Sequence, residues 1–156
     1  MKVNIVRLPH GMGLDLPSQG TPLSAGFDLS AAVDSPLEIK PRERVLVPTG
    51  FSIALPSGYE AQIRSRSGLS YKNGLVVLNA PGTIDADYRG EIKVLLINHG
   101  DEVFIVERGM RIAQLVVSKF EAVTWSEVLD HQDVDALDRN EKGFGSTGIH
   151  KRAEVA

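Results

Sequence analysis

The sequence predicts an all-β domain, and three observations support that prediction. Short apolar runs alternate with Gly and Pro turns through residues 1–128, at a spacing typical of strands in a sandwich, jelly roll or barrel. Almost no stretch shows the 3.6-residue period of an amphipathic helix. The chain of 156 residues is also long enough to bury a substantial core in one domain without disulfides.

The first half of the domain is expected to hold strands at 3–8, 25–32, 37–39, 44–47 and 51–55. The loop at 9–22 is rich in Gly and Pro and is not expected to be regular. Apolar and polar residues alternate strictly at 51–55, which predicts that Phe51, Ile53 and Leu55 face the core.

The second half is expected to hold strands at 59–66, 75–78, 92–97, 102–106 and 111–119. Residues 67–72 can form a single helical turn, for which Asn73-Gly74 supplies a left-handed stop. The strand at 111–119, like that at 102–106, is nearly continuously apolar, which predicts burial of each strand on both faces. Gln114 interrupts the strand at 111–119, and an unpaired buried amide would cost about 1–3 kcal/mol, so Gln114 needs a ligand or a backbone partner.

Composition excludes several classes of function. The 17 basic and 20 acidic residues give a formal net charge of −3, so nothing suggests general affinity for nucleic acid or an anionic membrane. No run approaches the ~18 apolar residues of a membrane span, and the N-terminus lacks the apolar stretch of a signal peptide. Cys is absent, which excludes disulfides and fits a reducing compartment. We therefore expect a soluble, cytoplasmic protein without nucleic-acid or membrane partners.

A polar loop at 79–91 separates the apolar runs at 75–78 and 92–97, a pattern typical of a hairpin tip. Asp85 and Asp87 bring carboxylates to the loop, Asn79 brings an amide and Tyr88 an aromatic ring. An ordinary solvated turn uses many of the same residue types. Taken by itself, the loop is therefore either a plain turn or a place where chemistry occurs.

Two other segments have the composition of a polyanion site. Arg64 and Arg66 stand near a strand end, with Ser hydroxyls and a possible helix N-terminus beside them, which suits phosphate. An exposed strand edge protected by charge is the alternative. Asp28 stands between Phe27 and Leu29, as either a turn former or an oxygen ligand near a hard cation held by phosphates.

Residues 129–156 are polar and acidic, with too little apolar surface to pack, and are expected to form a mobile arm. Within the arm, 143–148 reads GFGSTG, where glycines allow close backbone approach and amides can bind phosphate oxygens. A Gly-Ser linker is the alternative, because the segment lacks the Lys and spacing of a P-loop. The histidines His10, His99, His131 and His150 show no metal-ligand spacing and are expected at the surface.

Five segments, in family order, resemble the five motifs of the trimeric dUTP nucleotidohydrolases, the dUTPase family. They read AGFDL at 25–29, RSRSG at 64–68, GTIDADYRG at 82–90, RIAQL at 111–115 and RNEKGFGSTG at 139–148. Five ordered matches over nearly the whole domain favour the functional interpretation of each segment.

The resemblance implies a jelly-roll-like β-barrel or sandwich subunit at 1–128, followed by a flexible C-terminal arm at 129–156 that carries the fifth motif. It also implies a homotrimer whose three active sites lie at subunit boundaries, each drawing motifs from all three chains. The implied reaction is hydrolysis of dUTP to dUMP and pyrophosphate with Mg²⁺. That reaction limits uracil incorporation into DNA and supplies dUMP for dTMP synthesis.

The resemblance also implies roles for individual residues. Asp85 would be the catalytic base that activates the water attacking the α-phosphorus. Tyr88 would lie against the deoxyribose and exclude a 2′-hydroxyl, and Asp28 would hold Mg²⁺ through water. The other implied substrate-binding residues are Asn79, Gly82 and Ile84 for uracil, and Arg66, Ser67, Gly68 and Gln114 for the polyphosphate. Those in the arm are Arg139 for the γ-phosphate, Phe144 stacked on uracil, and Gly145 and Ser146.

The fifth motif departs from the family, because Asn140 and Lys142 stand where two glycines are usual. That departure bears on how easily the arm closes. Two alternatives to the hydrolase remain open. A dCTP deaminase of the same fold would need a differently furnished pocket, and a non-catalytic nucleotide-binding trimer would result if the arm could not close.

Overall fold

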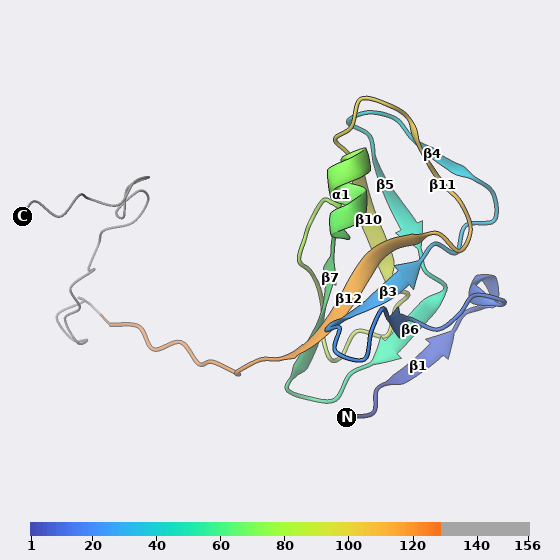
Figure 1. Ribbon diagram of the computed structural model, residues 1–156. Coiled ribbons are helices and arrows are strands. Elements are labelled where there is room, and N and C mark those ends of the chain that lie inside the picture. The colour runs from blue at the N-terminus through green and yellow to red at the C-terminus, as the bar shows by residue number, and fades with distance from the viewer. Residues whose placement is uncertain (129–156) are drawn as a thin grey trace, which may run out of the picture. The chain divides into compact units, whose positions relative to one another are not determined.

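Short strands joined by turns make up most of the protein, as Figure 1 shows. The computed structural model describes residues 1–128. The strands of the first half are β1 (Asn4–Arg7), β2 (Ser18–Gln19), β3 (Gly26–Ser30), β4 (Leu37–Ile39), β5 (Arg44–Pro48) and β6 (Phe51–Ala54). Those of the second half are β7 (Tyr59–Arg64), β8 (Leu75–Val77), β9 (Gly82–Ile84), β10 (Lys93–Asn98), β11 (Phe104–Val106) and β12 (Arg111–Lys119).

The strands form four sheets, and every strand pair is antiparallel. The largest sheet has the order β2-β3-β12-β7-β9, and a second has the order β5-β10-β8. Two-stranded sheets join β1 to β6 and β11 to β4. The prediction of a mostly β fold is confirmed, with one short α-helix among the described residues.

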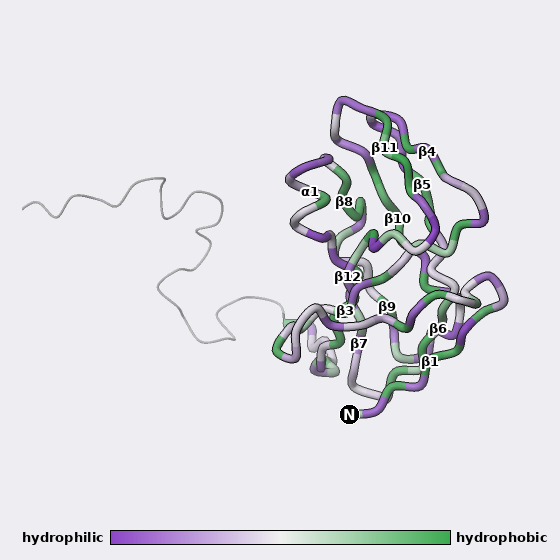
Figure 2. The backbone as a smooth tube through the Cα atoms, turned by 45° about the vertical axis from the view of Figure 1, so that its right-hand side comes forward, coloured by the Kyte–Doolittle hydropathy of each residue, from purple (hydrophilic) through white to green (hydrophobic). Residues whose placement is uncertain are grey.

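The core forms where the apolar faces of these strands meet. As predicted, Phe51, Ile53 and Leu55 are buried. Hydrophobic segments such as β8 and β10 supply further core residues (Figure 2). The other large apolar side chains that are fully buried are Leu29, Ile39, Val47, Leu75, Ile92, Val94, Leu96, Val106 and Ile112.

Strand β12 is buried on both faces only at its start, and Ile105 of β11 is 47% exposed, so the prediction of burial on both faces is wrong for both strands. Ile112 and Ala113 are both buried beside a register irregularity in the pairing with β3. Beyond it, side chains alternate between faces, because successive strand residues point in opposite directions. Leu115 and Val117 contact the core, whereas Gln114 lies half-buried on the opposite face.

Two loop predictions also need correction. The loop at 9–22 holds a 3₁₀ turn at Pro9–Gly11 and the strand β2, which pairs with β3. The Arg7 guanidinium donates to the carbonyl oxygen of Gly11 at 2.8 Å, which holds the 3₁₀ turn against β1.

Neither described helix is long and apolar enough to cross a membrane.

The segment between β8 and β10 does more than close a hairpin. The two strands pair as predicted, with Val77 opposite Leu96. Between them, however, β9 leaves that sheet and pairs with β7, placing Gly82 opposite Ile63. The loop therefore connects two sheets, and its polar residues lie at the end of the large sheet.

Helix α1 (Ser67–Asn73) begins where predicted, runs one residue beyond 72 and is stopped by Gly74, as predicted. It begins after Arg66, whose backbone is extended, and ends at Gly74 in the left-handed conformation. The Gly74 amide donates to the carbonyl oxygens of Leu69 and Ser70. The helix thus presents its first turn directly after the C-terminal end of β7.

Candidate functional site

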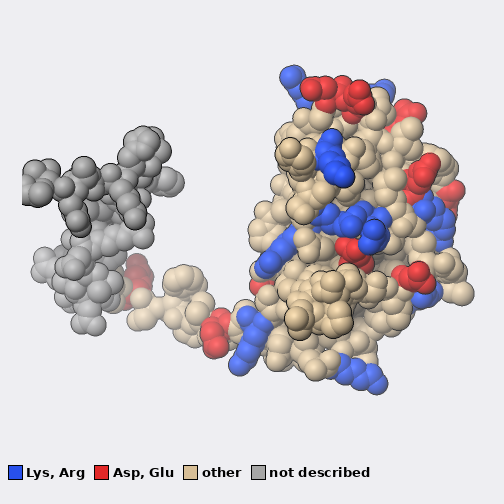
Figure 3. Space-filling view, in the orientation of Figure 1, with Lys and Arg blue, Asp and Glu red and all other residues tan. Residues whose placement is uncertain are grey.

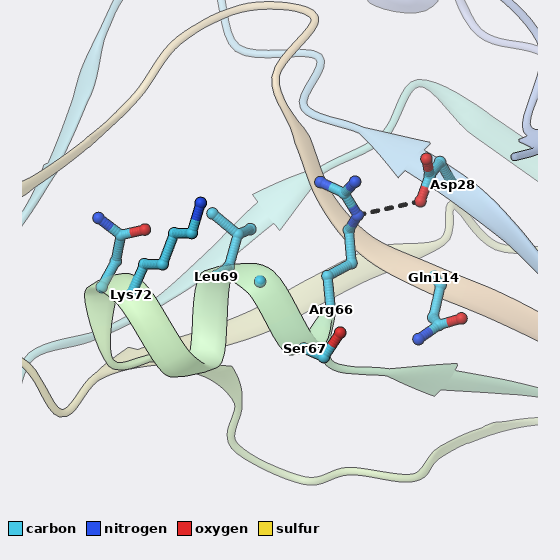
Figure 4. A pocket seen from close by; sticks show the side chains of 8 residues that line it. Asp28, Arg66, Ser67, Leu69, Lys72 and Gln114 are labelled. Carbon is cyan, nitrogen blue, oxygen red and sulfur yellow. Dashed lines mark ion pairs between the residues drawn. The ribbon is translucent and has the colours of Figure 1, made fainter.

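Predicted phosphate-binding residues gather around one pocket, which we call the arginine pocket (Figure 4). Its volume is about 300 Å³. Strand β3 contributes Asp28, β12 contributes Gln114, and Arg66 precedes the first turn of α1. The residues that line it are Asp28, Arg66, Ser67, Gly68, Leu69, Lys72, Asn73 and Gln114.

Strand register explains why these residues meet. Strand β12 lies between β3 and β7, and Gln114 is opposite Asp28 on one side and Arg64 on the other. Neighbouring strands lie about 4.8 Å apart, so three segments distant in sequence converge within side-chain reach. The pairing of β12 therefore assembles the arginine pocket.

The Asp28 carboxylate holds two arginines. Its Oδ1 lies 3.0 Å from Nε of Arg66, and its Oδ2 accepts a hydrogen bond of 3.0 Å from Nη1 of Arg111. Arg66 also donates from Nη1 to the Arg111 carbonyl oxygen at 2.8 Å. The side chains of Asp28 and Arg66 are 19% and 27% exposed, so solvent screens that pair only in part, whereas the Arg111 side chain is 60% exposed. Figure 3 shows basic side chains gathered beside acidic atoms at the centre of this face.

The sequence predicted that Gln114 needs either a ligand or a backbone partner, and the structure shows a backbone partner. Its amide nitrogen donates to the carbonyl oxygen of Ser65 at 2.9 Å. The Ser65 hydroxyl in turn accepts from the Val77 amide at 2.8 Å. One of the two amide hydrogens of Gln114 is thus satisfied, and the other can meet a ligand in the pocket.

A second pocket, of about 500 Å³, lies beside Asp85, and we call it the Asp85 pocket. Strand β9 ends at Ile84, and the chain then turns so that the Tyr88 amide donates to the Asp85 carbonyl oxygen at 3.1 Å. The Asp85 side chain is exposed. Lining residues are Leu46, Thr83, Ile84, Asp85, Tyr88, Glu91 and Lys93.

Tyr88 is held at the rim of the Asp85 pocket. Its hydroxyl donates to the Glu91 carbonyl oxygen at 3.0 Å, while the residue remains 44% exposed. A Cβ added at Gly90 would lie 2.3 Å from the Tyr88 hydroxyl oxygen, so only glycine leaves room for the ring. Asn79 is exposed on the approach to β9, and Gly82 is buried in it.

The two pockets lie toward opposite ends of the β7–β9 pair. Ala61 is opposite Ile84, so Asp85 continues the antiparallel pair beside Glu60. Arg66 follows the other end of β7, and the extended chain from Glu60 to Arg66 spans about 20 Å. A single chain therefore does not place the Asp85 carboxylate beside the Arg66 guanidinium.

Comparisons with known proteins agree with the five motifs. The family model described as dUTPase matches residues 13–148. The chain is 57% identical over 148 residues to the deoxyuridine 5'-triphosphate nucleotidohydrolase of Anaplasma marginale (strain St. Maries), covering 95% of this chain and 99% of that one. It is 58% identical over 146 residues to that of Aquifex aeolicus (strain VF5), covering 94% and 95%. The chain belongs to the dUTPase family.

Solved dUTPases share the fold. A Staphylococcus bacteriophage 80alpha dUTPase with dUPNHPP superposes with a TM-score of 0.84 at 26% identity, covering 95% of this chain and 99% of that one. A mutant dUTPase from phage phi11 of S. aureus has a TM-score of 0.74 at 21% identity, which shows the common fold alone. The family predicted from the sequence is confirmed.

The donors at the arginine pocket are suited to a magnesium ion that is bound mainly by the nucleotide and by water. In residues 1–128, no group of three or more His, Cys, Asp or Glu side chains could hold a metal directly. Each Asp28 oxygen meets one arginine and keeps a further lone-pair direction, which can accept from a water on the ion. The donors fit an ion that keeps several waters.

Several family motif residues lie outside the described residues. These are Arg139, Asn140, Lys142, Phe144, Gly145 and Ser146. His131 and His150 also lie outside the described residues.

The prediction that His10 lies at the surface needs correction. His10 is half-buried, with Nε2 2.6 Å from Oε1 of Glu91.

Two basic side chains at the arginine pocket, those of Lys72 and Arg111, were given no role from the sequence. Lys72 lines it from α1 and follows Gly68 by one helical turn, so helical spacing is a signal that could have found it. Arg111 was part of the fourth motif, but its contact with Asp28 depends on strand register. No local sequence pattern specifies that register.

Proposed function

We propose that the chain hydrolyses dUTP to dUMP and pyrophosphate, the activity that its relatives' names describe. The geometric observation that carries the proposal is the arginine pocket, where an oriented guanidinium, a Ser hydroxyl and a Gln amide surround one space. The test is pyrophosphate release from each deoxynucleoside triphosphate with Mg²⁺. Rapid release from dUTP alone supports the proposal, whereas uracil formed from dCTP would favour a deaminase.

Asp85 is the catalytic base in this proposal. Its carboxylate is exposed at the end of β9, where it can orient a water and take its proton as the water attacks the α-phosphorus. The bond from the α-phosphorus to the bridging oxygen breaks, and pyrophosphate leaves. The Asp85 carbonyl oxygen accepts a hydrogen bond from the Tyr88 amide. This turn holds the backbone from which the Asp85 carboxylate extends.

The arginine pocket binds the polyphosphate. Arg66 and Ser67 contact phosphate oxygens, with Ser67 near the oxygen that bridges the α- and β-phosphorus. Gly68 contributes backbone, and Gln114 donates its second amide hydrogen. Asp28 keeps Arg66 oriented before substrate arrives, which reduces the ordering that binding requires.

Asp28 would hold, through water, the Mg²⁺ ion of a bound nucleotide. When bound, the ion neutralises part of the triphosphate charge. The support in this chain is the position of Asp28 at the pocket, with lone pairs left beside its arginine contacts.

The Asp85 loop selects base and sugar. Asn79 with backbone near Gly82 and Ile84 pairs with the uracil edge, and Tyr88 lies against the deoxyribose. The support is that Tyr88 is exposed yet tied by its hydroxyl to Glu91, so its ring forms a fixed wall. A fixed wall leaves no space for the 2′-hydroxyl of UTP.

A homotrimer of jelly-roll-like subunits completes each site. The support is the separation of the two pockets along the β7–β9 pair, which one chain cannot close. In a trimer, the Asp85 pocket of one subunit faces the arginine pocket of another. The arm at 129–156 of a third subunit then brings Arg139 to the γ-phosphate and Phe144 to uracil, with Gly145 and Ser146 beside them.

We keep a cytoplasmic location as part of the proposal. The absence of Cys supports it, because the protein then has no need of an oxidising compartment.

A further inference from the structure

Glu91 is a largely buried carboxylate to which the proposed reaction gives no role. Its side chain is 12% exposed. Oε1 accepts from the Gly50 amide at 2.9 Å and lies 2.6 Å from Nε2 of His10, while Oε2 lies 3.8 Å from Nζ of Lys93. Burying a charge costs free energy unless it is paired, and here three groups compensate it.

The backbone around Glu91 is held as firmly as its side chain. The Glu91 carbonyl oxygen accepts the hydrogen bond from the Tyr88 hydroxyl. The next amide, of Ile92, donates to the Phe51 carbonyl oxygen at 2.8 Å, and the Thr49 hydroxyl donates to the Ile92 carbonyl oxygen at 2.6 Å. Glu91 therefore stands at the junction between the Asp85 loop and the turn that joins β5 to β6.

The partner of Glu91 in that turn is itself fixed. Gly50 has a φ of +74°, and its carbonyl oxygen accepts from the Leu8 amide at 2.8 Å. A Cβ at Gly50 would lie 2.4 Å from Cα of Gly11, so the two backbones touch. Three segments, around His10, Gly50 and Glu91, thus form one rigid support.

We propose that Glu91 is the positioning residue for the Asp85 loop, fastening its C-terminal end so that the Tyr88 ring stays in place to discriminate sugars. The proposal rests on the proposed function, because it takes Tyr88 as the wall against the deoxyribose. Glu91 lines the same pocket as Asp85 and Tyr88, so a displacement of Glu91 reaches both. A freed loop lets Tyr88 move away and admits the 2′-hydroxyl.

A merely structural role for Glu91 is the competing explanation, and variants separate the two. Glu91→Ala removes the anchor, and Glu91→Gln keeps an acceptor for the Gly50 amide with nearly the same shape. Asn98→Ala is the control, because it removes buried side-chain hydrogen bonds to the Ile39 and Glu102 carbonyl oxygens, which belong neither to the Asp85 loop nor to its support. His10→Ala removes one partner of the carboxylate and is used if Glu91→Ala does not fold.

The experiment measures kcat/KM for dUTP and UTP, and the affinities of their non-hydrolysable imido analogues, alongside Tm. We expect Glu91→Ala to reduce the dUTP-to-UTP ratio about tenfold, with Glu91→Gln and His10→Ala between it and wild type. Asn98→Ala should lower Tm and leave the ratio unchanged.

An unchanged ratio in every folded Glu91 and His10 variant would overturn the proposal. So would a ratio that falls equally in Asn98→Ala, because general destabilisation would then explain the loss. Failure of the proposed function looks different, since the wild type would then release no pyrophosphate from dUTP. The analogue affinities test the Glu91 anchor even in that case.

Discussion

The arginine pocket and the Asp85 pocket are built in different ways. In the first, charged side chains are already paired, with both oxygens of Asp28 on arginines. In the second, the paired carboxylate is that of Glu91, which supports the loop, and the Asp85 carboxylate is exposed. The difference suggests a division of labour, in which the paired half binds the anion and the exposed half meets water.

The largest expected effect tests the catalytic half. Asp85→Asn should lower kcat at least ~10²-fold and leave nucleotide affinity within about tenfold, because an amide cannot take the proton of water. Steady-state kinetics and analogue binding measure both quantities. The matched control is Asp87→Asn, which removes the other exposed carboxylate of the loop. Near-normal turnover in Asp85→Asn would remove Asp85 from its role.

The second prediction asks whether the two pockets belong to different subunits. If the protein is the proposed homotrimer, Asp85→Asn and Arg66→Ala should each be nearly inactive alone, whereas refolding the two variants together should restore activity. With free mixing, about three quarters of trimers are mixed and each has one intact site in three, so about a quarter of wild-type activity returns.

A mixture that stays inactive would place both residues in one chain's site. The control mixes wild-type subunits with each variant under the same conditions and follows size by scattering. If Arg66→Ala does not assemble, Ser67→Ala takes its place, because Ser67 lines the same pocket.

The third prediction concerns selectivity at the Asp85 pocket. Tyr88→Ala should bring kcat/KM for dUTP and UTP closer together, by about tenfold or more, because the ring no longer blocks the 2′-hydroxyl. Tyr88→Phe is the matched variant, since it keeps the ring and loses only the hydrogen bond to Glu91. A ratio that stays constant in Tyr88→Ala would place sugar discrimination elsewhere.

The smallest expected effect tests substrate binding at the arginine pocket. Lys72 lines the arginine pocket, so Lys72→Gln should raise KM for dUTP a few-fold, flatten its dependence on salt and leave kcat nearly unchanged. Lys40→Gln makes the same charge change at an exposed position after β4 and should do neither. Equal effects of the two substitutions would mean that net charge, and not the pocket, is responsible.

Local rules in the sequence determined much of this protein. The strands at 37–39 and 111–119 coincide with β4 and β12, and Gly74 ends α1 as predicted. Hydrophobic period and turn chemistry act over a few residues, so they can be read without a partner strand. The motifs identified the family and most of the residues that line the arginine pocket.

Tertiary structure alone decided how those residues meet. Strand β9 pairs with β7 and not within the β8–β10 hairpin. Arg111 donates a hydrogen bond to Asp28, and Glu91 accepts one from the Gly50 amide. Each contact joins segments far apart in sequence, through a register or a backbone approach that no local pattern encodes. Such pairings are set by how the whole set of strands shares one core, because a shift of one residue would turn every side chain of a strand to the other face.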